Sequence, residues 1–410
     1  MKPKPIGPIP PGYHALGGEL AIGGRTASDL VAEAGGTPLF VYSRALIDAR
    51  IADLRAALPQ RIGINYAIKA NPHADVIRHM EGLVDGFDIA SGGELALATK
   101  AGLDPARISF AGPGKRDDEL EAAIAAGVTL NCESEGEGRR AIAIGQRLSI
   151  APRIAIRVNP DFELKGSGMK MGGGAKPFGV DADKVSDLAR FLMGEGVTWR
   201  GLHIFTGSQA LSADAIIEAQ NNVLNLADEL SNEIGEALPK LNMGGGFGVP
   251  YFPGDEPVDL NAIGEALHGR MADLPDSLAK TDLCLELGRY LVGEAGVYLC
   301  RVIDRKESHG MTYLVTDGGL HHQLAASGNF GTVVRRNYPI AIANRYDTGP
   351  EEVVNVVGCL CTPLDRLADK AEMPRGQVGD IVAVFCAGAY GATASPSAFL
   401  GHGPAAEVLV

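Results

Sequence analysis

Residues 63–72 read GINYAIKANP, a predicted β-strand that runs into a lysine. Side chains alternate along a strand, so Ile62, Ile64 and Tyr66 share one face, while small residues and Lys69 share the other. The small face leaves space beside the lysine. Lys69 therefore either meets a carbonyl-bearing ligand or simply extends to solvent where the strand stops.

The same unit recurs from about residue 38 to 290: a short apolar run, a small or polar residue, then an amphipathic stretch. Eight strands alternating with helices predict a parallel sheet that closes into a (β/α)8 TIM barrel. An open doubly wound sheet is the alternative. The expected strands cover residues 62–68, 83–89, 107–110, 127–132, 153–158, 200–205, 239–243 and 282–287, and the clearest helical patterns cover 93–102, 116–127 and 213–234.

The two ends of the chain have a different texture. Residues 291–410 contain β-branched runs without helical spacing, which predict a mostly antiparallel β-barrel or sandwich. Residues 1–37 contain GGELAIGG and fit the same β domain. We therefore expect a barrel domain at 38–290 and a β domain built from 1–37 and 291–410.

One connection in the predicted barrel, residues 160–182, is long, and loops of this length are typically functional or disordered. Because no predicted strand precedes the glycines at 172–174, we interpret the segment as a flexible lid rather than a phosphate cradle. Its lysines Lys165, Lys170 and Lys176 would suit an acidic carrier protein. A solubilising loop is the alternative.

Composition narrows the class of partner. Lys and Arg number 37 against 50 Asp and Glu, a net charge of −13, which argues against nucleic acid or an anionic membrane as partner. No signal peptide and no run of about 18 apolar residues occurs, so we expect a cytoplasmic protein.

The cysteines and histidines point away from a metal. Six scattered cysteines without a CxxC pair predict reduced thiols. His321 and His322 are adjacent and would diverge on an extended segment, and the sequence has no HExxH motif or Cys/His cluster. We expect no metal site.

The ends of the predicted strands are polar, and in a TIM barrel these ends carry the chemistry. In chain order they supply Lys69, Asp88 with Ser91, Arg157, His203, the turn at 244–248, and Glu286 with Arg289.

The turn LNMGGGFG places Gly244, Gly245 and Gly246 directly after a strand, where successive amides can hold a phosphate. A glycine turn without a ligand is the alternative. Phosphate together with a lysine-reactive aldehyde indicates pyridoxal phosphate. Glu286 would then face the pyridine nitrogen, or form an ordinary salt bridge with Arg289.

Seven ordered motifs, which span about residues 10–408, carry a family resemblance: YAIKAN, FDIASGGEL, GLHIFTGSQ, MGGGFG, LELGRY, CTPLD and GAYG. They resemble the fold type III (alanine racemase-like) PLP-dependent decarboxylases, which include diaminopimelate, ornithine and arginine decarboxylases. The resemblance implies a cofactor-binding barrel, a β domain that contributes to a dimer interface, and a homodimer with shared active sites.

The resemblance also implies residue roles. Lys69 would form the Schiff base with pyridoxal phosphate, and His203, otherwise a core histidine, would stack on its ring. The remaining cofactor contacts implied are Ser208 with Gly244, Gly245 and Gly246 at the phosphate, Glu286 at the pyridine nitrogen, Arg157 at the pyridine edge, Asp88 near the lysine, and Arg289 at phosphate or substrate.

Two further residues would come from the neighbouring subunit. Cys361 would act as proton donor after CO2 departs, and Tyr390 would touch the cofactor phosphate. Without the resemblance, Cys361 would be interpreted as a buried small hydrophobic residue.

The sequence departs from the family pattern after Cys361. The diamino-acid decarboxylases have an acidic residue there that holds the distal ammonium of the substrate, whereas this chain has Thr362. A hydroxyl cannot supply that charge-assisted bond, worth roughly 1.5–3 kcal/mol, although Asp365 could compensate.

The CTPLD variant resembles the exosortase-associated decarboxylases and the butirosin-pathway enzyme that acts on a glutamyl group held by a carrier protein. We therefore expect decarboxylation of an L-α-amino acid or amino-acyl group with a neutral or carrier-tethered distal end, with Thr362 and Arg289 at the substrate. The alternatives are meso-diaminopimelate decarboxylase of lysine biosynthesis, an amino-acid racemase, and a non-catalytic PLP-binding regulator.

Overall fold

The computed structural model describes residues 2–328 and 336–410, which divide into two compact units. The barrel unit contains Ile51–Gly248 and Pro257–Gly288. The β unit contains Met1–Arg50, Val249–Glu256 and Arg289–Val410, of which Met1 and residues 329–335 lie outside the described residues.

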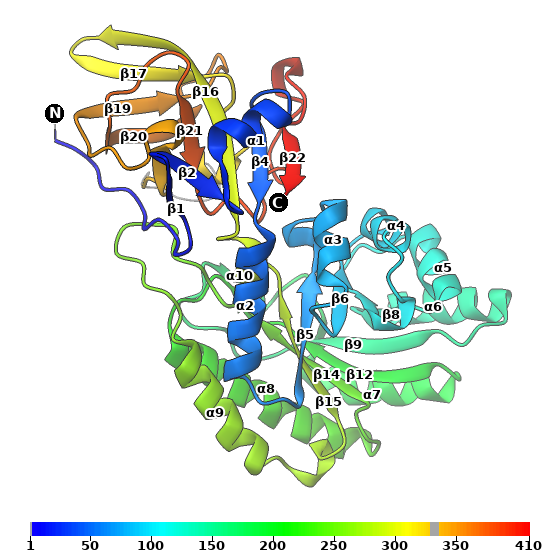
Figure 1. Ribbon diagram of the computed structural model, residues 1–410. Helices are drawn as coiled ribbons and strands as arrows, with labels where there is room; N and C mark the ends of the chain where they lie inside the picture. Colours follow the sequence, from blue (N-terminus) through cyan, green and yellow to red (C-terminus); the bar gives the residue numbers. More distant parts are fainter. Residues whose placement is uncertain (1, 329–335) are drawn as a thin grey trace. The chain divides into compact units, whose positions relative to one another are not determined.

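The sheet of the barrel unit is a closed ring of eight parallel strands (Figure 1). Pairing between β8 and β9 closes the ring, which confirms the predicted TIM barrel and rules out the open sheet. In chain order the ring strands are β5 (Ile62–Ala67), β6 (Gly86–Ile89), β7 (Ile108–Phe110), β8 (Thr129–Cys132), β9 (Arg153–Asn159), β12 (Thr198–Ile204), β14 (Lys240–Gly245) and β15 (Asp282–Leu287).

Helices alternate with these strands. They are α2 (Arg44–Ala57), which begins in the β unit, α3 (Ala74–Met80), α4 (Gly92–Lys100), α5 (Asp117–Ala126), α6 (Glu135–Leu148), α7 (Ala182–Gly194), α8 (Ala213–Ile234) and α9 (Leu260–Ala272). Local signals explain the bounds of α8. The Ser212 side chain accepts a hydrogen bond from the amide of Ala215, and Gly235 ends the helix with φ +78°.

Strand β5 shows why the lysine stands where it does. Ile64 and Tyr66 are fully buried, and Asn65 on the opposite face is also buried. The strand stops one residue earlier than predicted, because Ile68–Ala70 form a 3-10 turn in which the Asn71 amide donates to the Ile68 carbonyl. Lys69 therefore lies in the turn that follows the strand.

The main sheet of the β unit is mostly antiparallel, as predicted, with parallel pairing between β17 and β19 and between β4 and β22. Strands β4 and β22 pair with each other, so both ends of the chain enter one sheet (Figure 1). Its strands are β4 (Leu39–Tyr42), β16 (Gly296–Ser308), β17 (Met311–Thr316), β18 (Ile340–Ile342), β19 (Glu352–Val357), β20 (Arg366–Met373), β21 (Ile381–Val384) and β22 (Ala406–Leu409).

Smaller elements complete this unit. A three-stranded sheet near the N-terminus contains β1 (His14–Leu16), β2 (Glu19–Ile22) and β3 (Arg25–Thr26), and the helices are α1 (Ala27–Glu33) and α10 (Arg289–Val292).

The long connection at 160–182 contains more structure than the sequence predicts. Strand β10 (Met169–Lys170) precedes the three glycines and pairs with β13 (Gly207–Ser208), so the expectation that no strand precedes them is wrong. Strand β11 (Val180–Asp181) extends the sheet beside β9. The lid function remains a prediction.

Two of the three lysines in that connection already have partners. Lys165 pairs with Glu218 at 2.6 Å and Lys170 pairs with Glu163 at 2.7 Å, both on the surface. Exposed pairs of this kind contribute little to stability and exchange partners readily.

All six cysteines are free thiols. Among the described residues, no helix has both the length and the apolar character needed to cross a membrane.

Candidate active site

Glu286 is the centre of a buried charge cluster at the end of β15. Its Oε1 lies 3.4 Å from Lys69 Nζ and its Oε2 lies 3.0 Å from His203 Nε2. Burial alone would raise the pKa of Glu286, but Lys69, His203 and Arg157 together hold it below its usual value. The carboxylate is therefore ionised at neutral pH.

The parallel register of the barrel brings these residues together. His203 on β12 is the register partner of Arg157 on β9, and Asn65 on β5 is the register partner of Glu286. The Lys69 amine also lies 5.5 Å from the ring centre of Phe205, two residues beyond His203. The site thus places one carboxylate within hydrogen-bond reach of both a lysine and an imidazole.

Arg157 is held in place by a residue that the sequence analysis missed. Its guanidinium donates to Glu133 at 3.0 Å, and both side chains are buried. Glu133 also accepts from the amides of Gly112 and Gly179, at 2.5 and 3.0 Å. A buried acidic residue directly after β8, in the series of polar strand ends, was the available signal.

Asp88 lies on β6 in the interior of the barrel, beside the strand that leads to Lys69, because its register partner is Ala67. Its Oδ1 accepts hydrogen bonds from Ser109 and, at 3.4 Å, from Asn242. Burial and the nearby charge of Glu286 raise the pKa of Asp88 to about 6. Ser91, two positions beyond Ile89, instead caps α4 by accepting from the Glu94 amide.

Gly244 and Gly245 end β14 and Gly246 follows it, and this stretch leaves no room for side chains. Gly244 and Gly246 have φ of +68° and +84°. A Cβ on Gly244 would lie 2.7 Å from the Ile204 carbonyl oxygen, and one on Gly246 would lie 2.6 Å from the Gly207 carbonyl oxygen. Gly207 precedes Ser208, so the predicted phosphate residues form one neighbourhood of unhindered backbone.

Three buried polar atoms near the cluster have no hydrogen-bond partner within the described part of the chain: Asn65 Oδ1, Asp88 Oδ2 and His203 Nδ1. Such atoms are normally satisfied, so they indicate a polar ligand. If the Lys69 amine were bonded to the aldehyde of pyridoxal phosphate, the protonated pyridine nitrogen of that cofactor would take the place of the lysine ammonium beside Glu286. The residues therefore fit pyridoxal phosphate.

The β unit holds the remaining predicted site residues, and two of them lie together. The Arg289 guanidinium lies 4.7 Å from the ring centre of Tyr390 and donates to the Tyr251 hydroxyl at 2.8 Å. Tyr390 thus contacts Arg289 of its own chain. That Tyr390 touches the cofactor phosphate of a neighbouring subunit remains a prediction.

The loop after β19 carries Cys361 on its surface, and the Thr362 side chain is half-buried. Asp365 is buried, and its two oxygens accept from the amides of Leu320 and Leu360 at 2.6 and 2.9 Å. That carboxylate is engaged within its own chain, which leaves the predicted substrate contact of Asp365 without support.

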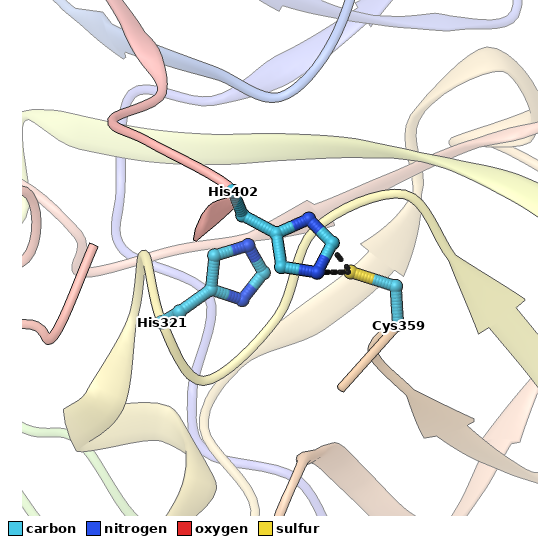
Figure 2. A group of neighbouring side chains, drawn as sticks. All are labelled: His321, Cys359 and His402. Carbon is cyan, nitrogen blue, oxygen red and sulfur yellow. Dashed lines mark hydrogen bonds between the residues drawn. The ribbon is translucent and has the colours of Figure 1, made fainter. Parts of the chain in front are cut away.

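The sequence has no local Cys/His cluster, but the fold brings one together. His321, Cys359 and His402 of the β unit lie together, with potential ligand atoms within 4.8 Å of one another (Figure 2). Residues 321–322 form a turn rather than an extended segment, so the two histidine rings lie with centres 3.9 Å apart.

A family model described as "Pyridoxal-dependent decarboxylase, pyridoxal binding domain" matches residues 44–293. The chain is 36% identical to the L-glutamyl-[BtrI acyl-carrier protein] decarboxylase of Niallia circulans, over 91% of this chain and 88% of that protein. It is 34% identical to the diaminopimelate decarboxylase of Archaeoglobus fulgidus, over 97% of this chain and 93% of that protein.

Among solved structures, diaminopimelate decarboxylase of M. jannaschii in co-complex with L-lysine is similar, with a TM-score of 0.87 and 26% identity. The match covers 97% of this chain and 92% of that chain.

Proposed function

Because this chain belongs to the pyridoxal-dependent decarboxylase family, we propose that it removes the α-carboxyl group of an L-α-amino acid head whose distal end is neutral or tethered to a carrier protein. The cofactor is pyridoxal phosphate. The observation that carries the residue assignment is the Lys69–Glu286–His203 cluster, with distances of 3.4 and 3.0 Å around one buried carboxylate.

Each residue of the cluster has a separate task. Lys69 would hold the cofactor through its aldehyde. Glu286, which is ionised, would keep the ring nitrogen protonated, and His203 would pack on the ring. The bound cofactor supplies the electron sink for the electron pair left when CO2 departs.

The backbone and the arginines position the ligand. Gly244, Gly245 and Gly246 with Ser208 would hold the phosphate, and Arg157 would lie at the pyridine edge. Arg289 and Tyr390, which contact each other, serve the phosphate or the substrate.

Cys361 completes the reaction. The bond between the α-carbon and the carboxyl group breaks, CO2 leaves, and the thiol proton of Cys361 forms the new C–H bond. We place this cysteine in the neighbouring subunit's site, so the active form is a homodimer that shares its sites, and the β domain contributes to both interface and site. Its exposure is consistent with that role.

The substrate proposal depends on Thr362. A hydroxyl cannot neutralise a buried distal ammonium, and Asp365 is committed to backbone amides. The relative from Niallia circulans acts on a glutamyl group attached to a carrier protein, which agrees with a distal end that carries no ammonium. We therefore favour a carrier-tethered acidic amino acid such as glutamyl.

A CO2-release assay tests the proposal. The substrates are L-glutamate thioester-linked to an acyl carrier protein, free L-glutamate, L-lysine, L-ornithine and meso-diaminopimelate. We expect the highest kcat/KM for the carrier-linked substrate. Loss of optical rotation without CO2 release would instead indicate a racemase, and a cofactor-loaded protein that neither releases CO2 nor changes optical rotation would indicate a PLP-binding regulator.

Diaminopimelate decarboxylation is the second candidate, because the relative from Archaeoglobus fulgidus that carries this name covers 97% of the chain. The highest kcat/KM for meso-diaminopimelate would select it.

The Thr362→Glu variant sharpens the choice. A new charge-assisted hydrogen bond, worth roughly 1.5–3 kcal/mol, should raise kcat/KM for diaminopimelate about 10–150-fold. Thr362→Gln, which has similar volume without the charge, is the matched control and should show no such gain. If both variants changed kcat/KM for diaminopimelate equally, a charge at position 362 would not determine the choice of substrate.

A further inference from the structure

Three potential metal ligands meet in the β unit, and none of them has a role in the proposed decarboxylation. His321 follows β17, Cys359 follows β19, and His402 precedes β22. The Cys359 sulfur lies 3.8 Å from His402 Nε2 and 3.9 Å from its Nδ1, and the ring centres of His321 and His402 are 4.8 Å apart. Figure 2 shows the sulfur directed at the His402 ring, with the His321 ring alongside.

His321 is the strongest indication of a ligand. Its side chain is fully buried, and neither ring nitrogen has a hydrogen-bond partner within residues 2–328 and 336–410. A buried polar group left unsatisfied costs about 1–3 kcal/mol, a cost that a bound metal would remove.

A thiol–imidazole nucleophile is the competing interpretation of Cys359 and His402. A nucleophilic cysteine is activated as a thiolate in an electropositive setting, whereas the Cys359 thiol donates to the Asp317 carbonyl at 3.6 Å. A metal ion would displace the thiol proton and take the sulfur as a ligand.

The chemistry of the three ligands selects the metal. Two imidazoles and one thiolate suit Zn²⁺, which binds sulfur at about 2.3 Å and nitrogen at about 2.0–2.1 Å in tetrahedral geometry. Tetrahedral ligands at those lengths lie roughly 3.5 Å apart. The sulfur lies 3.8 and 3.9 Å from the two His402 nitrogens, so a small movement of the half-buried Cys359 or the exposed His402 side chain would bring either nitrogen to that separation.

The three segments are already fastened by hydrogen bonds around the cluster. Asp365 accepts from the Leu320 amide, which joins the loop after β19 to the segment of His321. His322 Nε2 bonds the Gly403 carbonyl at 3.0 Å, which joins that segment to the residue after His402. Such surrounding contacts orient metal ligands and are typical of built sites.

We propose that His321, Cys359 and His402 bind a zinc ion, which leaves a fourth position for water, and that the ion fastens the loop carrying Cys361 to the C-terminal segment. Cys361 is two residues from Cys359, so the ion would set the position of the proton donor. This positioning role rests on the proposed function, whereas the metal site does not.

Cobalt binding tests the site with the cofactor-loaded protein. After treatment with a chelator, wild type is titrated with Co²⁺. We expect one Co²⁺ per chain, a near-ultraviolet thiolate-to-cobalt absorption band, and the intense visible bands of tetrahedral cobalt. Cys359→Ser should lose the near-ultraviolet band and at least about 100-fold in affinity, since even outer contacts of metal sites are worth 10–100-fold.

Two further variants complete the design. His402→Gln, an exposed position, should also weaken Co²⁺ binding and keeps the test valid if Cys359→Ser does not fold. Cys361→Ser, an exposed cysteine of the same loop, should keep the band and the affinity.

Wild type that binds no Co²⁺ or Zn²⁺, or Cys359→Ser and His402→Gln variants with wild-type affinity, would overturn the metal site. Failure of decarboxylation in a protein that shows the cobalt band would count against the proposed function alone. If the metal-free protein decarboxylates with unchanged kcat and unchanged fidelity of proton transfer, the positioning role is wrong.

Discussion

The cluster around Glu286 and the cluster around Cys359 are built in opposite ways. In the barrel, Lys69, His203 and Glu286 follow or end parallel strands whose register makes them neighbours. In the β unit, His321, Cys359 and His402 come from three loops. Regular strand pairing brings chemistry together predictably, whereas loops do so only through individual contacts. The two clusters should therefore fail independently.

Replacing Lys69 with alanine should have the largest effect. Without the amine that holds the cofactor aldehyde, CO2 release should fall on the order of 10⁴-fold or more, and cofactor content after dialysis should drop. Lys280→Ala, which removes an exposed lysine of the same unit, should match wild type. Unaltered turnover and cofactor content in Lys69→Ala would contradict the barrel assignment.

Metal removal should come next and should affect only the second cluster. At free zinc about 1,000 times its Kd, a bound ion stabilises the folded state by about 4 kcal/mol, so a chelator should lower the unfolding midpoint of wild type. Lys69→Ala should respond as wild type does, and Cys359→Ser should not respond. If the chelator shifted the unfolding midpoint equally in all three proteins, its effect would not depend on the Cys359 cluster.

Changing Glu286 to glutamine should lower kcat by about 10²–10³-fold while the cofactor still binds, because a neutral amide cannot keep the ring nitrogen protonated. Single-turnover CO2 release and cofactor content are the two measurements. Glu229→Gln, at an exposed position of α8, is the control. A Glu286→Gln enzyme with unchanged kcat would show that the carboxylate only pairs with Lys69.

Asp88 gives the smallest effect and a defined pH dependence. Its pKa is about 6 in the folded state and about 3.9 in the unfolded chain, so the folded state binds more protons between these values. Stability of the cofactor-free protein should thus fall by about 1–3 kcal/mol as pH rises from about 4 to 6, then level off.

Denaturant unfolding from pH 4 to pH 8 measures this contribution. Asp88→Asn should remove it, whereas Asp273→Asn, at an exposed site, should retain it. If the stability of Asp88→Asn depended on pH as that of wild type does, the group responsible for the pH dependence would be another residue.

The sequence predicts the barrel well because its signal is periodic. All eight expected strands are present, and α8 has the predicted bounds because Ser212 and Gly235 mark its ends. Lys69 and Glu286 were identifiable as polar residues at strand ends, and the closed ring then places them together. Glu133 escaped notice because its role depends on amides of two other loops.

The Cys/His cluster escaped prediction for a different reason. Its members are 38 and 43 residues apart in the chain, since they stand at positions 321, 359 and 402, so no spacing rule applies. The assumption that residues 321–322 are extended also failed, because they form a turn in which Gly319 accepts the His322 amide. Nothing local in the sequence distinguishes that turn from a strand end.

The way Asp365 is bonded separates two properties of the loop that carries Cys361. The Asp365 carboxylate accepts from two backbone amides and so sets the path of the chain, whereas the Thr362 hydroxyl accepts a hydrogen bond from the Leu364 amide two residues away, at 3.3 Å. Substitutions of Thr362 can therefore change the substrate range, while Asp365 keeps the shape of the loop. Related enzymes could thus come to accept substrates with different distal groups while the loop that carries Cys361 keeps its structure.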